Sequence, residues 1–181
     1  APFVTLANAG SLIGTIDLGD GDDIVTNTGI WNSTNGENFL GDGADTVTIG
    51  NGGVWNAVGS TTHFAFVDGE DDGEGGPVVA ALPVGDELIV AAGGTINAGN
   101  TEFTGLELLT LNGGTLSTVN TVLNQTVTTD GDLTINAGSV VHVETGANGA
   151  NDVIVADGLV DINGGTLRVT HVGAAAPTIG N

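Results

Sequence analysis

The chain has 181 residues and a very uneven charge, because 22 aspartates and glutamates face one basic residue, Arg168, giving a net charge of −21. Such a charge repels nucleic acids and anionic membranes, so we expect no nucleic-acid partner. The absence of cysteine excludes disulfides, thiolate metal sites and cysteine nucleophiles. The apolar runs are far shorter than the ~20 residues that span a bilayer, so we expect no membrane insertion by this segment.

Short stretches of alternating apolar and polar residues, separated by Gly, Asn or Asp, fill the chain from end to end. In chain order they predict strands at residues 24–26, 46–49, 87–90, 106–111, 132–135, 140–143, 152–155 and 166–169. No stretch has a helical period of useful length, so we expect little helix. The pattern predicts an all-β fold that forms one domain over residues 1–181.

Two repeats specify the kind of all-β fold. Leu18–Thr26 and Leu40–Thr48 are near copies that begin 22 residues apart, and each is followed by a Trp-Asn pair. In the second half, a glycine-containing pair before a strand recurs at residues 93, 113, 137 and 164. Repeats of this length are typical of a β-solenoid coil. We predict a single-stranded parallel β-helix, right-handed, with about seven to nine coils.

Asparagines and an acidic segment complete the pattern. Seven asparagines recur at expected turns, where stacked side chains can hydrogen-bond along the axis: Asn27, Asn32, Asn56, Asn97, Asn112, Asn136 and Asn163. Residues 68–76 are rich in acids and glycines and cannot pack in a core, so we expect an exposed acidic loop there.

The repeated motif Gly-x-Gly-x-Asp-x-Val, at Gly19–Val25 and Gly41–Val47, resembles the nonapeptide of repeats-in-toxin proteins. In that family, turn carbonyls and an aspartate bind calcium between stacked coils, so the resemblance implies ligand roles for Asp23 and Asp45. The alternative is that Asp and Gly form tight, solvated turns. Calcium is the one cofactor that the sequence indicates. The candidate metal ligands are Asp20, Asp22, Asp23, Asp42 and Asp45.

No arrangement of residues indicates an active site. His63, His142 and His171 lie far apart without ligand spacing, and no nucleophile, phosphate-loop or zinc-protease motif is present. A carbohydrate-active β-helix enzyme would require a cleft that brings acids together with Arg168. We therefore predict that the chain is not an enzyme, with such a carbohydrate-active enzyme as an alternative.

Residues 151–173 resemble the distal part of a bacterial autotransporter passenger of the pertactin-like group, and residues 14–27 resemble passenger repeats. The resemblance implies that residues 150–181 form the passenger's C-terminal region, and it places the chain outside the cell or on the bacterial surface. In the family, this region precedes a membrane barrel, and whether one follows in the full gene stays open.

Together these patterns predict a non-enzymatic extracellular rod with a structural and adhesive function. Its expected partners are a host or neighbouring-cell surface, or other copies of the chain through the solenoid ends, which can build filaments. Two alternatives stay open: a calcium-binding module like the toxin repeats, and the carbohydrate-active enzyme.

Overall fold

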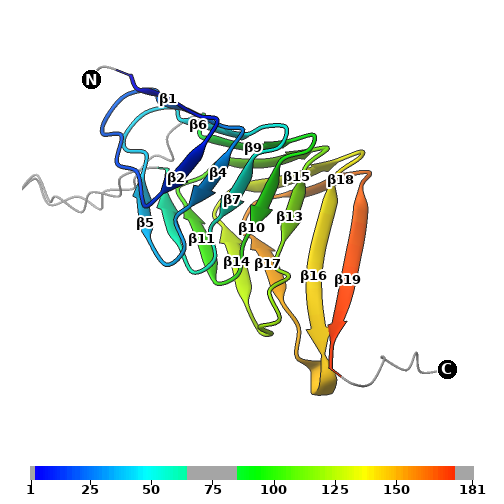
Figure 1. Cartoon of the computed structure of the whole chain (residues 1–181). Coiled ribbons are helices and arrows are strands. Elements are labelled where there is room, and N and C mark those ends of the chain that lie inside the picture. Colours follow the sequence, from blue (N-terminus) through cyan, green and yellow to red (C-terminus); the bar gives the residue numbers. More distant parts are fainter. Residues whose placement is uncertain (1–2, 65–84, 174–181) are drawn as a thin grey trace, which may run out of the picture.

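Three parallel sheets form the structure, which is a computed structural model that describes residues 3–64 and 85–173 (Figure 1). Sheet A contains β1 (Thr5–Asn8), β3 (Ile24–Asn27), β6 (Thr46–Ile49), β9 (Glu87–Ala91), β12 (Leu108–Asn112), β15 (Asp132–Asn136) and β18 (Val160–Asn163). Sheet B contains β2 (Ser11–Ile13), β4 (Ile30–Asn32), β7 (Val54–Asn56), β10 (Thr95–Asn97), β13 (Thr115–Ser117), β16 (Val140–Gly146) and β19 (Thr166–Val172). Sheet C contains β5 (Glu37–Phe39), β8 (Thr61–His63), β11 (Thr101–Thr104), β14 (Thr126–Thr129) and β17 (Val153–Ala156).

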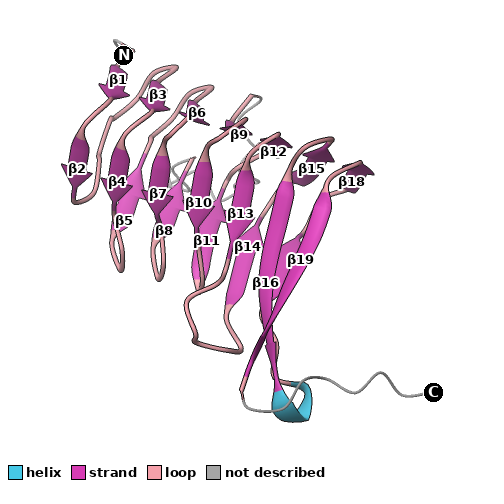
Figure 2. Cartoon of the chain, turned by 45° about the vertical axis from the view of Figure 1, so that its right-hand side comes forward, coloured by secondary structure: helices cyan, strands magenta, loops and turns pink. Residues whose placement is uncertain are grey.

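Each strand pairs in parallel with the equivalent strand one coil before and one coil after, so successive coils are stacked from β1 and β2 at the left of Figure 2 to β18 and β19 at the right. Sheets A and B hold seven strands each, and the described residues therefore form seven coils. The predicted all-β parallel β-helix is confirmed, and the coil count is at the lower end of the expected range. At about 4.8 Å per step, sheet A extends about 30 Å along the stack.

The stack continues across residues 65–84. Strand β6 pairs directly with β9, through Thr46 to Glu87 and Ile49 to Val90, so sheet A has no break at this point. The acidic loop expected at residues 68–76 lies outside the described residues, as does the 174–181 part of the passenger-like segment.

Inward-facing side chains form continuous ladders that fill the core. One ladder in sheet B runs, coil by coil, through Leu12, Trp31, Trp55, Ile96, Leu116, Val141 and Leu167. The indoles of Trp31 and Trp55 stack with ring centroids 4.3 Å apart and planes 3° from parallel, and both residues are fully buried. The tryptophans of the Trp-Asn repeat therefore belong to a core ladder.

The glycine pairs make the corners that lead into sheet B. In Gly93-Gly94, the first glycine has φ +81°, a left-handed conformation that suits glycine. The second has no room for a side chain, because a Cβ at Gly94 would overlap the carbonyl oxygen of Ile49 in the previous coil. Each corner thus turns sharply and lies close to the corner below it.

The one described helical turn is a 3-10 helix, Ala147–Gly149, between β16 and β17. Within residues 3–64 and 85–173, no helix has the length and apolar character needed to cross a membrane. The expectation of little helix is confirmed.

Candidate functional site

A column of four acidic residues lines the turn that leads into sheet A: Asp23, Asp45, Asp86 and Glu107, one in each of four successive coils. Each of them directly precedes a strand, and backbone hydrogen bonds connect each to the next coil, as from Thr46 N–H to the Asp23 carbonyl. We call this set the acid column. Its first three carboxyl groups are buried, with at most 1% of each residue exposed.

Each buried carboxyl group of the acid column bridges two coils. The Oδ1 atom of Asp45 accepts a hydrogen bond from the Asp23 N–H at 2.7 Å, and Oδ1 of Asp86 accepts one from the Asp45 N–H at 2.7 Å. At the start of the column, Oδ1 of Asp23 accepts a hydrogen bond from the Val4 N–H at 2.6 Å. An aspartate is favoured here because its short side chain reaches the backbone N–H of the coil below.

The second oxygen of each buried carboxyl group has no hydrogen-bond partner. These atoms are Oδ2 of Asp23, Asp45 and Asp86, all buried. A buried, unpartnered carboxylate oxygen is costly, and protonation of the carboxyl group removes most of that cost. The geometry therefore favours the neutral form of Asp45 and Asp86.

Burial raises the pKa of Asp45 to about 6 and that of Asp86 to about 7. Loss of solvation is the largest cause for both residues, and the backbone hydrogen bond to each carboxylate partly opposes it. Neighbouring acids add to the increase, since Asp45 lies beside Asp23 and Asp86 lies beside Asp45. Between about pH 4 and pH 6, Asp45 and Asp86 therefore hold protons that ordinary aspartates have released.

The structure divides the five predicted metal ligands into two groups. Asp23 and Asp45 belong to the acid column, whereas Asp20, Asp22 and Asp42 are exposed in the same turns. Oδ1 of Asp22 accepts a hydrogen bond from the Ala44 N–H at 3.0 Å. In the described part of the chain, no three acidic or histidine side chains form a group that could hold a metal ion.

Sequence reasoning missed Asp86 and Glu107. Asp23 and Asp45 are 22 residues apart, but Asp86 follows 41 residues after Asp45, because residues 65–84 are inserted between the two coils. The signal that could have found Asp86 is the Gly-Asp pair directly before an apolar strand, since a small residue followed by Asp also precedes β6.

Two further acids accept backbone N–H groups, and two of the histidines contact threonine hydroxyl groups. A hollow of about 450 Å³ is lined by Glu107, Leu108, Asp130, Gly131, Asp132 and Gly158. Its acids already accept backbone N–H groups: Asp130 accepts that of Gly105 at 2.8 Å, and Asp132 that of Leu159 at 2.7 Å. Arg168 does not line this hollow.

His63 and His142 each contact a threonine hydroxyl from the next coil, at Thr104 (2.8 Å) and Thr170 (2.7 Å). Burial, followed by the nearby positive charge of Arg168, lowers the pKa of His142. Both imidazoles therefore have partners that hold them within a sheet.

No protein family, curated protein or solved structure matches the chain. The likeness to autotransporter passengers and to toxin repeats stays a prediction based on the segments quoted above. Function is therefore inferred from the coil stack, the acid column and the outward-facing rows.

Proposed function

We propose that the chain is a non-enzymatic structural and adhesive rod on the outside of a bacterial cell, similar to an autotransporter passenger. The observation that carries the proposal is the unbroken pairing of sheet A from β1 to β18. Because each coil places equivalent residues in a straight row, weak contacts are repeated along the rod. Repetition raises avidity without a deep binding pocket.

The row that fits this role best lies on the outer face of sheet A. Register places Thr26, Thr48, Thr110 and Thr134 in one row, with Ile89 between the second and the third. All four threonines are half-buried, on the face opposite the core ladder. These hydroxyl groups lie one coil apart within each pair and two coils apart across Ile89, at about 4.8 Å per coil, and they can donate and accept hydrogen bonds to a glycan or protein surface. We call it the threonine row.

The charge distribution is consistent with an extracellular role. With one basic residue among 22 acidic ones, salt-bridge networks between side chains are ruled out, and the carboxylates keep the rod dispersed in water. A like-charged cell surface would repel the rod at low ionic strength, so contact depends on uncharged groups such as the threonine row.

The test measures binding of the chain, labelled at Ala147→Cys, to epithelial cells and to bacterial cells. We expect saturable binding that the double variant Thr48→Ala/Thr110→Ala weakens about thirtyfold, because two hydroxyl contacts of about 1 kcal/mol each are lost. The matched control is Thr95→Ala/Thr115→Ala, which removes two hydroxyls from one outward row of sheet B. Absence of saturable binding to both surfaces, or equal losses in both variants, would contradict the proposal.

A calcium-binding module is the second candidate, favoured by the unpartnered Oδ2 atoms of Asp23 and Asp45. A ligand that binds only the folded chain raises the melting temperature. On this proposal, millimolar calcium raises the melting temperature by several degrees relative to chelator. Asp45→Asn removes the increase and Asp132→Asn keeps it. Identical melting curves with calcium and with chelator exclude this candidate.

A further inference from the structure

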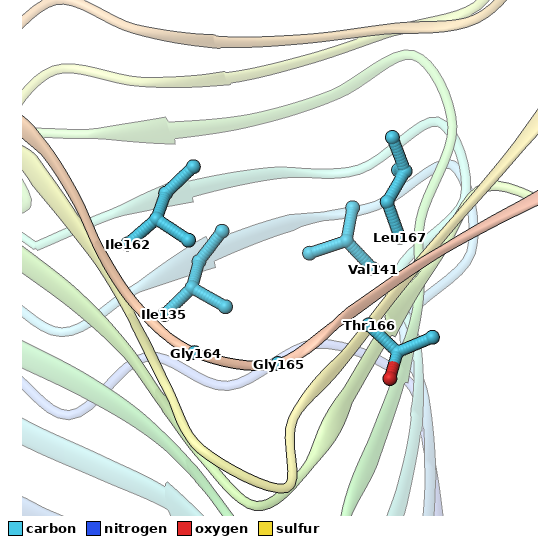
Figure 3. Close-up of a pocket in the computed structure, with 7 residues that line it drawn as sticks. All are labelled: Ile135, Val141, Ile162, Gly164, Gly165, Thr166 and Leu167. Carbon is cyan, nitrogen blue, oxygen red and sulfur yellow. The ribbon is translucent and has the colours of Figure 1, made fainter.

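The last coil of the stack exposes a cross-section of the core. Ile162 in β18 and Leu167 in β19 occupy the same ladders as Ile135 and Val141, which are at most 9% exposed, yet Ile162 is 67% exposed and Leu167 is 68% exposed. Together with Gly164, Gly165 and Thr166, these residues line a hollow of about 300 Å³ (Figure 3). We call this surface the C-terminal face.

The strand edges at the C-terminal face are unpaired among the described residues. Strands β18, β19 and β17 are the last strands of sheets A, B and C. Such edges offer backbone N–H and C=O groups to a further strand. The face therefore combines an apolar centre with three parallel edges, the same combination that each coil presents to the next.

The opposite end of the stack carries the complementary surface. Strands β1 and β2 are the first strands of sheets A and B, at the far end from β18 and β19 (Figure 1). Leu6 and Leu12 start the ladders that end at Val160 and Leu167, and both leucines are only partly buried. We call this surface the N-terminal face. Within the stack, the C-terminal side of each coil always contacts the N-terminal side of the next coil.

We propose that the C-terminal face binds the N-terminal face of a second copy, so that the coil stack continues from molecule to molecule. The contact repeats the coil-to-coil interface inside the chain: parallel strands in sheets A and B, with Leu12 of one copy over Leu167 of the other. Because the two surfaces differ, the contact is heterologous, and repetition gives an open filament rather than a closed dimer. The inference does not depend on adhesion, since a rod can bind cells with or without assembly.

Charge controls this assembly. Each copy carries a net charge of −21, so stacking brings like charges together, and added salt screens that repulsion. We therefore expect filaments to lengthen as ionic strength rises, which is opposite to the behaviour of a contact held by ion pairs.

The experiment measures mass by analytical ultracentrifugation and shape by electron microscopy, over a range of protein and salt concentrations. The parent chain is expected to form linear oligomers. Ile162→Glu, which blocks the C-terminal face, and Leu12→Glu, which blocks the N-terminal face, are each expected to stay monomeric alone. Mixed in equal amounts they are expected to form a dimer and nothing larger, because each retains one working face. Val122→Glu, a matched charge at an exposed site away from both ends, is expected to assemble like the parent.

Circular dichroism verifies that each variant is folded. A parent chain that stays monomeric at high concentration and high salt would overturn the proposal. So would self-association of Leu12→Glu alone, which would show that two C-terminal faces pair with each other. Neither result affects the adhesion test, which is performed at concentrations where the chain is monomeric.

Discussion

The buried acids of this β-solenoid affect the stability of the fold in the opposite direction, with changing pH, from most aspartates. Most aspartates in proteins stabilise the fold when ionised, because they are solvated or paired. Asp45 and Asp86 have a hydrogen bond to one oxygen only, and burial raises their pKa values to about 6 and about 7. These two residues therefore stabilise the fold when they are protonated.

We predict that Asp86→Asn stabilises the protein at pH 8 and has little effect at pH 4. The unfolded aspartate has a pKa of about 3.9, so the stability that Asp86 contributes is fully present below that pH and is lost as the pH rises through about 7. Since one pKa unit corresponds to about 1.4 kcal/mol, the expected gain at pH 8 has an upper limit of about 4 kcal/mol. Urea unfolding at both pH values measures it.

The control for this prediction is Asp22→Asn, which removes the same charge from an exposed turn. This variant measures how much stability is gained simply because one negative charge is removed from a chain whose many negative charges repel one another. Equal stabilisation by both variants, or destabilisation by Asp86→Asn at pH 8, would show that Asp86 is ionised at little cost in the folded chain.

At the scale of strands and turns, the sequence predicts many of the strands whose inward-facing residues are apolar. The strands predicted at residues 24–26, 46–49 and 132–135 correspond to β3, β6 and β15, because alternating Val, Ile and Leu residues mark their inward faces. The expected stacking of asparagines is also seen, since Nδ2 of Asn97 donates to Oδ1 of Asn56 at 2.8 Å, although these two residues end β10 and β7 rather than lying in turns.

Sheet C could not be read in the same way, because its inward positions are partly polar. Asn38 in β5 and Thr62 in β8 are fully buried, and Nδ2 of Asn38 donates to Oγ1 of Thr62 at 3.1 Å. An alternation of apolar and polar residues is missing there, so periodicity indicated one strand of sheet C, β17, through the predicted strand at residues 152–155, and gave no signal for the other four. The threonine row was hidden for another reason: residues 65–84 separate β6 from β9, and the register across them is visible only in three dimensions.

We predict that Gly94→Ala destabilises the fold by about 1–3 kcal/mol, the typical range for overpacking. The added Cβ would overlap the Ile49 carbonyl oxygen, and neither corner can move without breaking sheet pairing. Chemical denaturation compares it with Gly10→Ala, where an added Cβ meets nothing within 4 Å. If the two variants unfold at the same denaturant concentration, the corners are not in contact.

At the scale of the whole molecule, the stack is a short rod with two different ends and continuous sides. The sides carry rows such as the threonine row, and the ends carry the C-terminal and N-terminal faces. The acid column runs along the stack between its two ends, and its hydrogen bonds join four successive coils. Side contacts and end contacts thus use separate surfaces, which is why adhesion and assembly can be tested separately.

The central claim is that coils on either side of residues 65–84 stack in register, and disulfide trapping tests it most directly. The chain has no cysteine, so any disulfide within one chain must form between the two cysteines that are introduced. Asn56 and Asn97 are partners in neighbouring strands of sheet B, whereas Asn32 and Asn97 are two coils apart. At about 4.8 Å per step, only the first pair is within the ~7 Å limit for a disulfide. We predict rapid, complete oxidation of Asn56→Cys/Asn97→Cys within one chain and none for Asn32→Cys/Asn97→Cys. Failure of the first pair, or equal oxidation of both, would contradict the stacked solenoid.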